Sequence, residues 1–299
     1  MSHADSFHAR LLTEAYRAAL CSDHATTRVG AVIADQDGRP VSRACNGFPH
    51  GITHSVERVI TSELWDYYSL HAEMRALLGW MRQGREGHPQ PLTIASTHTP
   101  CAACASALVA MIPAGLGTVV LDACLPREES AYPPKWKRSV ELGRHLLEEG
   151  GMAIHEIPAT LSYPDEGDMA GSWWQLKHSF DQAKPSAQNA HSPLGWKYDP
   201  CIDWRDDPFM AALMKHFIQT SMPMRDMRVR LPLDMLSGST ALILVDLHVA
   251  HVELGTMNPA QHSPEQDFAL GLLREAQIPF AYARSLSDIV FKTVETVSL

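Results

Sequence analysis

Apolar positions in the first half of the chain alternate between the spacing of a helix and that of a strand. Residues 5–20 carry apolar side chains three and four apart, as on one face of a helix. Residues 28–34 have the pattern of a buried strand, and the Asp37-Gly38 turn leads into a second strand at 40–44. Beyond them the pattern predicts helices at 70–80, 101–111 and 135–149, and strands at 92–96, 117–121 and 152–157. This alternation predicts an α/β fold whose sheet is covered by helices on both faces.

The pattern weakens in the middle of the chain and returns in its last hundred residues. Residues 161–199 contain several Pro, Gly, Ser and Asn residues, which predicts a linker or a wrapping segment. We then expect a helix at 208–219, a strand at 241–247, a helix opened by a capping box at 263–266, a strand at 278–283 and a closing helix after residue 285. The expected organisation is a first domain at 1–160, the linker at 161–199 and a smaller C-terminal α/β module of unknown role at 200–299.

Composition narrows the class of protein. The chain has 299 residues, of which 45% are hydrophobic and 20% are charged, which is typical of a globular protein and excludes a fibrous or disordered chain. No apolar run approaches the roughly 18 residues of a membrane span, and the N-terminus lacks the layout of a signal peptide. The six cysteines include one C-x-x-C, which favours a metal site or reduced thiols over disulfides. We therefore expect a cytoplasmic protein without a membrane partner.

The charge disfavours a nucleic-acid partner. The formal net charge is −9, with −3 in residues 1–160 and −6 in residues 161–299. Neither part offers the cationic surface that a polynucleotide normally requires. A small-molecule substrate is the better expectation.

Two short motifs carry the candidate chemistry, and each stands at the start of a predicted helix. They are His71-Ala72-Glu73 and Pro100-Cys101-Ala102-Ala103-Cys104. Cys101 and Cys104 are three apart and share one helix face, where the positive helix N-terminus favours thiolates. With a neutral His71 they would fill three of the four tetrahedral positions of Zn²⁺. The fourth position is then left for water, as in catalytic zinc sites.

Glu73 has a different expected role from His71. His71 and Glu73 are two positions apart, which places them about 200° apart around a helix. Their side chains can therefore converge only around the first turn. Glu73 would stay off the metal and move protons between the zinc-bound water, the substrate ring and the leaving ammonia. Taken alone, a C-x-x-C is often a structural zinc site or plain packing, and an H-x-E is common by chance. Together, in this order, they form the signature of zinc deaminases.

Residues 1–158 resemble the zinc-dependent cytidine deaminase superfamily, most closely the deoxycytidylate (dCMP) deaminases. The resemblance rests on four stretches, at residues 28–33, 46–51, 71–74 and 99–104. It implies a cytidine-deaminase-like five-stranded mixed sheet flanked by helices, Zn²⁺ as cofactor, and a homo-oligomer. It also implies His71, Cys101 and Cys104 as zinc ligands, Glu73 as proton shuttle, and hydrolysis of dCMP to dUMP and ammonia.

The substrate residues follow partly from the same resemblance, which assigns a substrate contact to Asn46. Ala72, Arg75 and Thr99 are the other candidates for substrate binding, although Arg75 replaces the asparagine that is usual in the family. Arg28, Gly47 and Gly51 are candidates for a phosphate or allosteric loop, with dCTP and dTTP as the implied effectors; the glycines could equally form a plain turn.

Three alternatives stay open at this point. The substrate could be another nucleotide, either a modified cytosine or a purine such as dAMP or dGMP, because zinc activation of water serves all of them. The protein could instead be a catalytically silent, nucleotide-sensing assembly protein. A second, structural zinc site would draw on a group without compact spacing, namely Cys21, His24, Cys45, His50 and His54.

Overall fold

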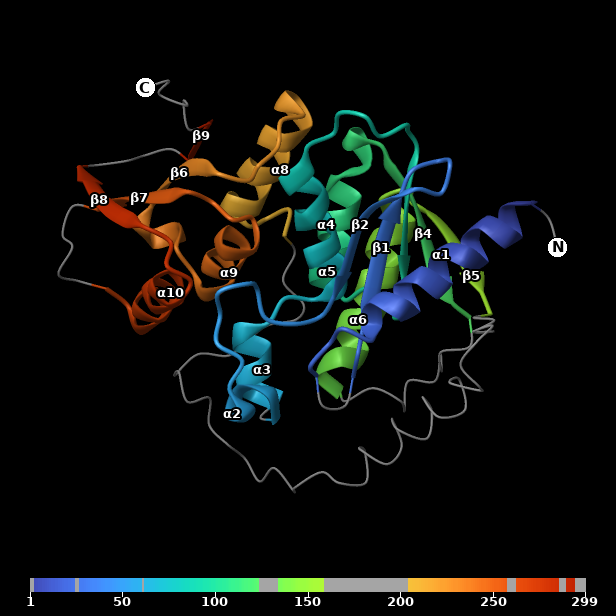
Figure 1. Ribbon diagram of the computed structural model, residues 1–299, viewed down its shortest axis with the longest axis horizontal. Helices are drawn as coiled ribbons and strands as arrows, with labels where there is room; N and C mark the ends of the chain where they lie inside the picture. Colours follow the sequence, from blue (N-terminus) through green and yellow to red (C-terminus); the bar gives the residue numbers. More distant parts are fainter. Residues whose placement is uncertain are drawn as a thin grey trace.

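The computed structural model describes residues 3–24, 27–60, 62–123, 134–158, 204–256, 262–284 and 289–293, and it contains two separate sheets (Figure 1). The predicted linker at 161–199 lies outside the described residues. No helix among the residues described is both long and apolar enough to span a membrane.

The first sheet has five strands in the order β2-β1-β3-β4-β5. Its strands are β1 (Gly30–Ala34), β2 (Pro40–Cys45), β3 (Leu92–Ser96), β4 (Leu116–Asp122) and β5 (Ala153–Ile157). The pairs β1–β2 and β1–β3 are antiparallel, whereas β3–β4 and β4–β5 are parallel. The expected five-stranded mixed sheet is confirmed, and every one of its strands was predicted.

Alternate residues of β1 explain why helices cover both faces of this sheet. Val32 and Ala34 pack with residues of α1 (His3–Ala19) on one face. Ala31 and Ile33 belong to the core on the opposite face, beneath α4 (Ala72–Gln83) and α5 (Ala102–Ala110). A strand buried on both faces has this continuous apolar pattern because successive side chains point to opposite sides. The remaining helices of this part are α2 (Val56–Ile60), α3 (Ser62–Tyr68), α6 (Pro134–Glu149) and the 3₁₀ turn at Ile112–Ala114.

The second sheet is smaller and has the order β8-β7-β6-β9. Its strands are β6 (Met227–Pro232), β7 (His251–Thr256), β8 (Phe280–Arg284) and β9 (Val290–Thr293). The three strands β6, β7 and β8 are parallel, and β9 is antiparallel to β6. Its helices are α8 (Pro208–Thr220), α9 (Gly238–Asp246), α10 (Pro264–Glu275) and the 3₁₀ turn at Leu233–Met235. The predicted C-terminal α/β module is therefore present.

Two predictions in this module are wrong. The segment predicted as a strand at 241–247 is the helix α9, which begins where the Ser237 side chain accepts a hydrogen bond from the Thr240 N–H. Eight of its nine residues are buried, so it shows no amphipathic period, and a short apolar run of this kind does not distinguish a buried helix from a strand. The closing helix expected after residue 285 is also contradicted, because Val290–Thr293 form β9. Strands β6 and β7 were not predicted.

The two sheets share one hydrophobic core through α4. The Trp80 ring of α4 meets the Phe217 ring of α8 edge to face, with centroids 5.2 Å apart. Both side chains are fully buried, and residues of the two parts belong to one continuous apolar cluster. Figure 1 shows α4 between the first sheet and the C-terminal module. The helix that begins at the H-x-E motif is thus held from both sides.

Candidate active site

The side chains of His71, Cys101 and Cys104 meet at the N-terminal ends of α4 and α5. The Nδ1 atom of His71 lies 3.3 Å from Sγ of Cys101 and 3.4 Å from Sγ of Cys104. The three ligand atoms all lie within 4.8 Å of one another. Ligands at about 2.0 and 2.3 Å from a tetrahedral zinc ion stand about 3.5 Å apart. The nitrogen–sulfur distances therefore fit Zn²⁺.

Local backbone structure explains why these side chains converge. His71 (φ −69°, ψ 156°) and Cys101 (φ −66°, ψ 169°) are the extended residues that precede α4 and α5. Cys104 lies in the first turn of α5. Both helices direct their positive N-terminal ends to this point, which favours thiolate over thiol.

The electrostatics of the cluster agree with a cation site. The hydrogen bond from Cys104 and the nearby His71 hold the pKa of the Cys101 thiol well below its ordinary value. The same hydrogen bond to Cys101 raises the pKa of Cys104. Burial opposes protonation of His71, but Cys101, Glu73 and Asp66 together outweigh it and raise the pKa of His71 to about 9. Cys104 and His71 thus each keep a proton at neutral pH, and a divalent cation would displace both.

Three protein ligands are characteristic of a catalytic zinc site, since structural sites have four. Within the described part of the chain, this is the one group of three or more His, Cys, Asp or Glu side chains with ligand atoms close enough to share a metal. The five residues considered for a second zinc, Cys21, His24, Cys45, His50 and His54, are all described and form no such group.

Glu73 lies beside the His71, Cys101 and Cys104 group and is held by a serine of the sheet. Its carboxylate is buried, and Oε1 accepts a hydrogen bond of 2.8 Å from the Ser96 hydroxyl at the end of β3. Burial raises the pKa of Glu73, against the opposing effects of His71 and Ser96. A buried carboxylate with a raised pKa suits proton transfer. Sequence reasoning missed Ser96; the signal was a hydroxyl at the end of an otherwise apolar strand.

Helix α6 packs against the segment that carries the cysteine motif. The Ser139 hydroxyl accepts a 3.1 Å hydrogen bond from the backbone N–H of Ala102, in the first turn of α5. A Cβ at Gly143 would lie 2.1 Å from the Pro100 carbonyl oxygen, so only glycine permits this close approach. The Trp136 ring lies 5.3 Å from the His71 ring. Trp136 therefore packs beside His71 of the candidate metal site.

Asn46 organises the chain around the end of β2. Its Oδ1 accepts hydrogen bonds from the Ser22 hydroxyl (2.7 Å) and the Val29 N–H (2.9 Å), and its Nδ2 donates to the Thr27 carbonyl (3.0 Å). The side chain is buried. These contacts hold the segment before β1 against the Asn46–Gly51 loop.

Of the other residues predicted to bind substrate or phosphate, Gly47 lies beside His71, whereas Gly51 lies against the C-terminal module. Gly47 exchanges backbone hydrogen bonds with Leu70 (3.1 and 3.0 Å), which brings its loop beside His71. Ala72 is fully buried, and Thr99 and Arg28 are half-buried. Gly51 lies at the opposite end of the loop, with φ at +97°, where a Cβ would lie 3.1 Å from Cα of Ala276 in the C-terminal module.

Arg75 lies on the side of α4 away from Glu73. The two residues are about 200° apart around the helix. The Arg75 guanidinium donates to the Cys45 carbonyl (3.1 Å) and pairs with Asp246 at the end of α9 (3.3 Å). Arg75 therefore joins the first sheet to the C-terminal module.

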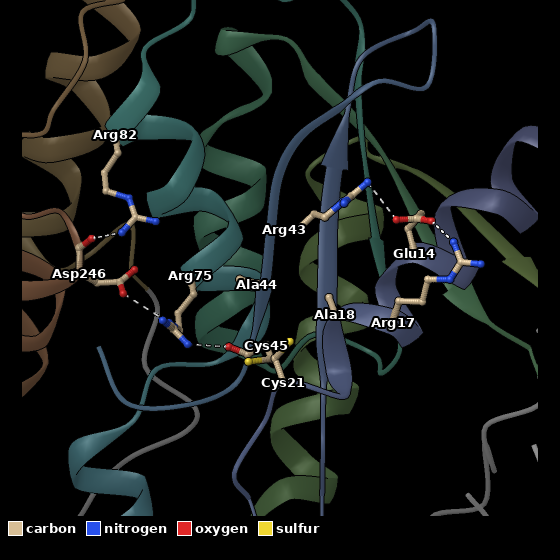
Figure 2. A pocket seen from close by; sticks show the side chains of 10 residues that line it. All are labelled: Glu14, Arg17, Ala18, Cys21, Arg43, Ala44, Cys45, Arg75, Arg82 and Asp246. Atoms are coloured by element: carbon tan, nitrogen blue, oxygen red, sulfur yellow. Dashed lines mark hydrogen bonds and ion pairs between the residues drawn. The ribbon is translucent and has the colours of Figure 1, made fainter. Parts of the chain in front are cut away.

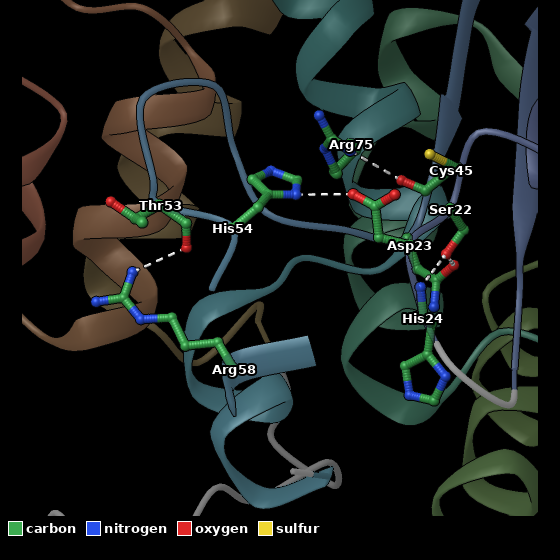
Figure 3. A network of polar contacts seen from close by, with 9 residues as sticks. Ser22, Asp23, His24, Cys45, Thr53, His54, Arg58 and Arg75 are labelled. Atoms are coloured by element: carbon green, nitrogen blue, oxygen red, sulfur yellow. Dashed lines mark hydrogen bonds and ion pairs between the residues drawn. The ribbon is translucent and has the colours of Figure 1, made fainter. Parts of the chain in front are cut away.

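An aromatic cluster that the sequence did not assign lies beside the same loop. The Trp65 ring contacts His24 edge to face at 4.6 Å and Phe48 at 4.8 Å. Burial, followed by the charge of His71, lowers the pKa of His24 to about 4. Its Nδ1 accepts a 2.8 Å hydrogen bond from the Thr27 N–H, which requires the neutral ring. Figure 3 shows His24 below Ser22.

Polar contacts also connect the loop to α10. The Arg58 guanidinium donates to both carboxylate oxygens of Glu275 (2.6 and 3.0 Å) and to the Thr53 carbonyl (3.1 Å). The Thr53 N–H donates to Glu275 Oε1. His54 pairs with Asp23 at 2.7 Å, and Figure 3 shows this contact and that of Arg58 with Thr53. The C-terminal module thus holds one end of the loop whose other end lies beside His71.

Comparisons with known proteins agree with this geometry. Residues 1–121 match the family model of the cytidine and deoxycytidylate deaminase zinc-binding region, whereas the C-terminal part has no match to a family model. The chain is also 28% identical over 136 residues to an uncharacterized deaminase in the luxG 3' region of Aliivibrio fischeri. That similarity covers 46% of this chain and 83% of the other protein.

Proposed function

Because residues 1–121 carry the zinc-binding region of the cytidine and deoxycytidylate deaminases, we propose that this protein hydrolyses the 4-amino group of a cytosine mononucleotide, converting dCMP and water to dUMP and ammonia. One observation carries the proposal. Three side chains that could bind zinc converge at two helix ends, and the buried Glu73 lies next to them without being one of the group. That is the arrangement of a hydrolytic site, with an open coordination position and a proton carrier beside it.

The residues divide the work between binding and proton transfer. His71, Cys101 and Cys104 would hold the zinc ion, which when bound lowers the pKa of water toward about 7 and so supplies a nucleophile at neutral pH. Ser96 donates to Oε1 of Glu73 and fixes the carboxylate, so proton exchange with the reactants falls to Oε2. Glu73 would accept one proton of the attacking water and give it to the ring nitrogen N3. It would then take the second proton from the hydroxyl added at C4 and deliver it to the departing amino group. The C4–N bond breaks as ammonia leaves, and a C4 carbonyl remains.

The preference for a mononucleotide rests on charge and on the loop at residues 46–51. Both halves of the chain are acidic, which disfavours a polynucleotide. The backbone pairing of Gly47 with Leu70 brings this loop to the residue that precedes His71. Asn46, Ala72 and Thr99 remain our candidates for contacts with the substrate, with Arg28 and Gly47 near its phosphate.

The C-terminal module, residues 200–299 in our division, has a supporting role in this proposal. It packs Phe217 against Trp80 of α4, pairs Asp246 with Arg75 of the same helix, and binds Arg58 through Glu275. These contacts fix α4 and the loop, the two elements that carry His71 and Asn46.

The decisive experiment compares Glu73→Gln with the wild type in the release of ammonia from dCMP. Glutamine keeps the shape and an acceptor for Ser96 but cannot carry a proton, so kcat should fall about 10²- to 10⁴-fold while bound zinc stays at the wild-type level. Glu149→Gln, an exposed change on α6, is the control. Unchanged turnover in Glu73→Gln would contradict the mechanism.

A substrate panel tests the base. Turnover of dAMP or dGMP in place of dCMP would leave the zinc chemistry in place and move the assignment to a purine. If the zinc-loaded wild type binds dCMP but releases no ammonia from any nucleotide, the proposed enzymatic activity is refuted and a nucleotide-sensing role is favoured.

A further inference from the structure

Arg75 contacts the chain on both sides of Asn46. Its Nη1 atom donates a 3.1 Å hydrogen bond to the Cys45 carbonyl, which Figures 2 and 3 both show. The same atom lies so close to Gly47 that a Cβ added there would be 3.3 Å from it. The guanidinium therefore packs against the residue immediately before Asn46 and the residue immediately after it.

These contacts give the end of β2 a second anchor. Strand β2 lies at the edge of the first sheet, so it has a neighbouring strand on one side only. Asn46, which follows it, is bound to the segment before β1, since its N–H donates to the Val29 carbonyl at 3.0 Å. Arg75 adds an anchor from α4, the helix that also carries Glu73. One helix thus holds the proposed proton carrier and braces the proposed substrate residue.

Asp246 of the C-terminal module orients the Arg75 guanidinium. Its Oδ1 atom accepts from Nε of Arg75 at 3.3 Å, and its side chain is only 1% exposed. No described residue donates a hydrogen bond to the buried Oδ2. Figure 2 shows Arg75 reaching from the Asp246 carboxylate to the Cys45 carbonyl. Because a buried charge requires a partner, Asp246 keeps Arg75 in this position.

An arginine suits these two contacts better than a lysine. Nε binds Asp246 while Nη1 binds Cys45, so one partner orients the planar group that the other partner uses. A guanidinium presents several N–H donors in a fixed plane, whereas a lysine ammonium is a single charged point. The geometry of the pair is therefore transmitted to the backbone at Cys45.

We propose that Arg75, oriented by Asp246, is a positioning residue: it fixes the backbone around Asn46 and thereby sets the affinity for the nucleotide. The inference rests on the proposed function, because it takes Asn46 as a substrate contact. It gives the C-terminal module a specific task, which is to supply the buried carboxylate that orients the guanidinium. KM depends on the pair, whereas kcat depends on Glu73 and the metal.

Two variants of the full-length, zinc-loaded protein separate positioning from stability. Arg75→Met leaves the charge of Asp246 buried without a partner, so it should lower both the free energy of unfolding and the affinity. Combining it with Asp246→Asn removes that charge and should restore most of the stability, but the Cys45 carbonyl still lacks its donor. KM for dCMP, from ammonia release, should therefore be raised about 3- to 10-fold in both, as for one lost hydrogen bond, at unchanged kcat and zinc content. A KM that returns to the wild-type value with the stability would overturn the proposal.

Asp246→Asn alone tests the order of action. It should raise KM in the wild-type background and add nothing to the effect of Arg75→Met, because Asp246 acts through Arg75. Independent, additive effects on KM would contradict this order.

Arg82→Met is the matched control. Arg82 lies about two turns further along α4, and its described hydrogen bonds are to the Asp246 carbonyl (2.8 Å) and the His248 ring (3.2 Å). It thus binds the same module without bracing the loop, and its variant should leave KM unchanged. An equal rise in KM would show that any loosening of the module has this effect, which would overturn the specific role of Arg75.

Amide hydrogen exchange of Asn46 and Gly47, measured by NMR, decides the question independently of turnover. Their N–H groups donate to the carbonyls of Val29 (3.0 Å) and Leu70 (3.1 Å). Exchange should accelerate at least about tenfold in the double variant and stay unchanged in Arg82→Met. Unchanged exchange in the double variant would overturn the positioning role. If the wild type releases no ammonia while exchange still accelerates, the proposed function fails and the bracing of the loop by Arg75 stands.

Discussion

The Glu275 carboxylate joins α10 to the loop that follows β2, so Glu275→Gln tests whether the C-terminal module stabilises that loop. The carboxylate accepts two hydrogen bonds from Arg58 and one from the Thr53 N–H. The side chains of Arg58 and Glu275 are 20% and 22% exposed. The pair is therefore partly shielded from solvent but not buried.

The expected loss in the free energy of unfolding follows from this intermediate exposure. Hydrogen bonds to charged groups contribute about 1.5–3 kcal/mol when shielded, whereas exposed ion pairs contribute about 0.2–1 kcal/mol. We expect the free energy of unfolding to fall by about 1–2 kcal/mol at pH 7. Glutamine keeps one acceptor for Arg58, so the loss reports mainly the charge.

The pH dependence distinguishes this contact from a packing effect. Burial alone would raise the pKa of Glu275, but the hydrogen bonds from Arg58 and Thr53 outweigh it and lower the pKa. A carboxylate with a lowered pKa contributes stability that is fully present above its unfolded pKa of about 4.3 and is lost as pH falls through the lower folded value. The difference between the wild type and Glu275→Gln should therefore be full at pH 6–7, begin to shrink near the unfolded pKa, and be lost as pH falls through the lower folded pKa.

Urea unfolding followed by circular dichroism across this pH range measures the difference. Glu149→Gln, on the exposed face of α6, should change the free energy of unfolding by less than about 0.5 kcal/mol at every pH. A loss in Glu275→Gln that is the same at pH 7 and in acid would show that the charge does not act through Arg58, and no loss at all would refute the supporting role of this contact.

Three further changes test other parts of the argument. Cys101→Ala should lose bound zinc, measured by metal analysis, together with the proposed deaminase activity, measured by ammonia release. Full retention of zinc would contradict the role of Cys101 as a ligand. Ser96→Ala should lower kcat by about tenfold at unchanged zinc content and KM, because Glu73 loses the donor that fixes it. Phe217→Ala should reduce the free energy of unfolding by about 3–5 kcal/mol in one transition seen by all probes, since it opens a cavity against Trp80 in the shared core; two separate transitions would show that the two parts do not share it.

Most of the first part of the structure is encoded locally, and the sequence determined it. Strand β3 lies at the predicted residues, and the helix N-termini that carry His71 and Cys101 lie within a residue or two of the predicted starts. The capping box at Ser263 and Gln266 also forms as predicted. Hydrophobic period, caps and ligand spacing all act over a few residues, so they can be read directly from neighbouring positions.

Tertiary structure decided the identity of α9 and the partners of the polar side chains. The all-apolar segment of α9 is a helix because it is buried on every side, which no local period reveals. Ser96 meets Glu73 across 23 positions of sequence, and Asp246 meets Arg75 across 171. Such contacts depend on how helices and strands pack, because a buried charge or hydroxyl takes whichever partner the packed core brings within hydrogen-bond distance. The sequence alone therefore predicted the three side chains of the candidate metal site, whereas only the folded chain revealed the residue that holds Glu73.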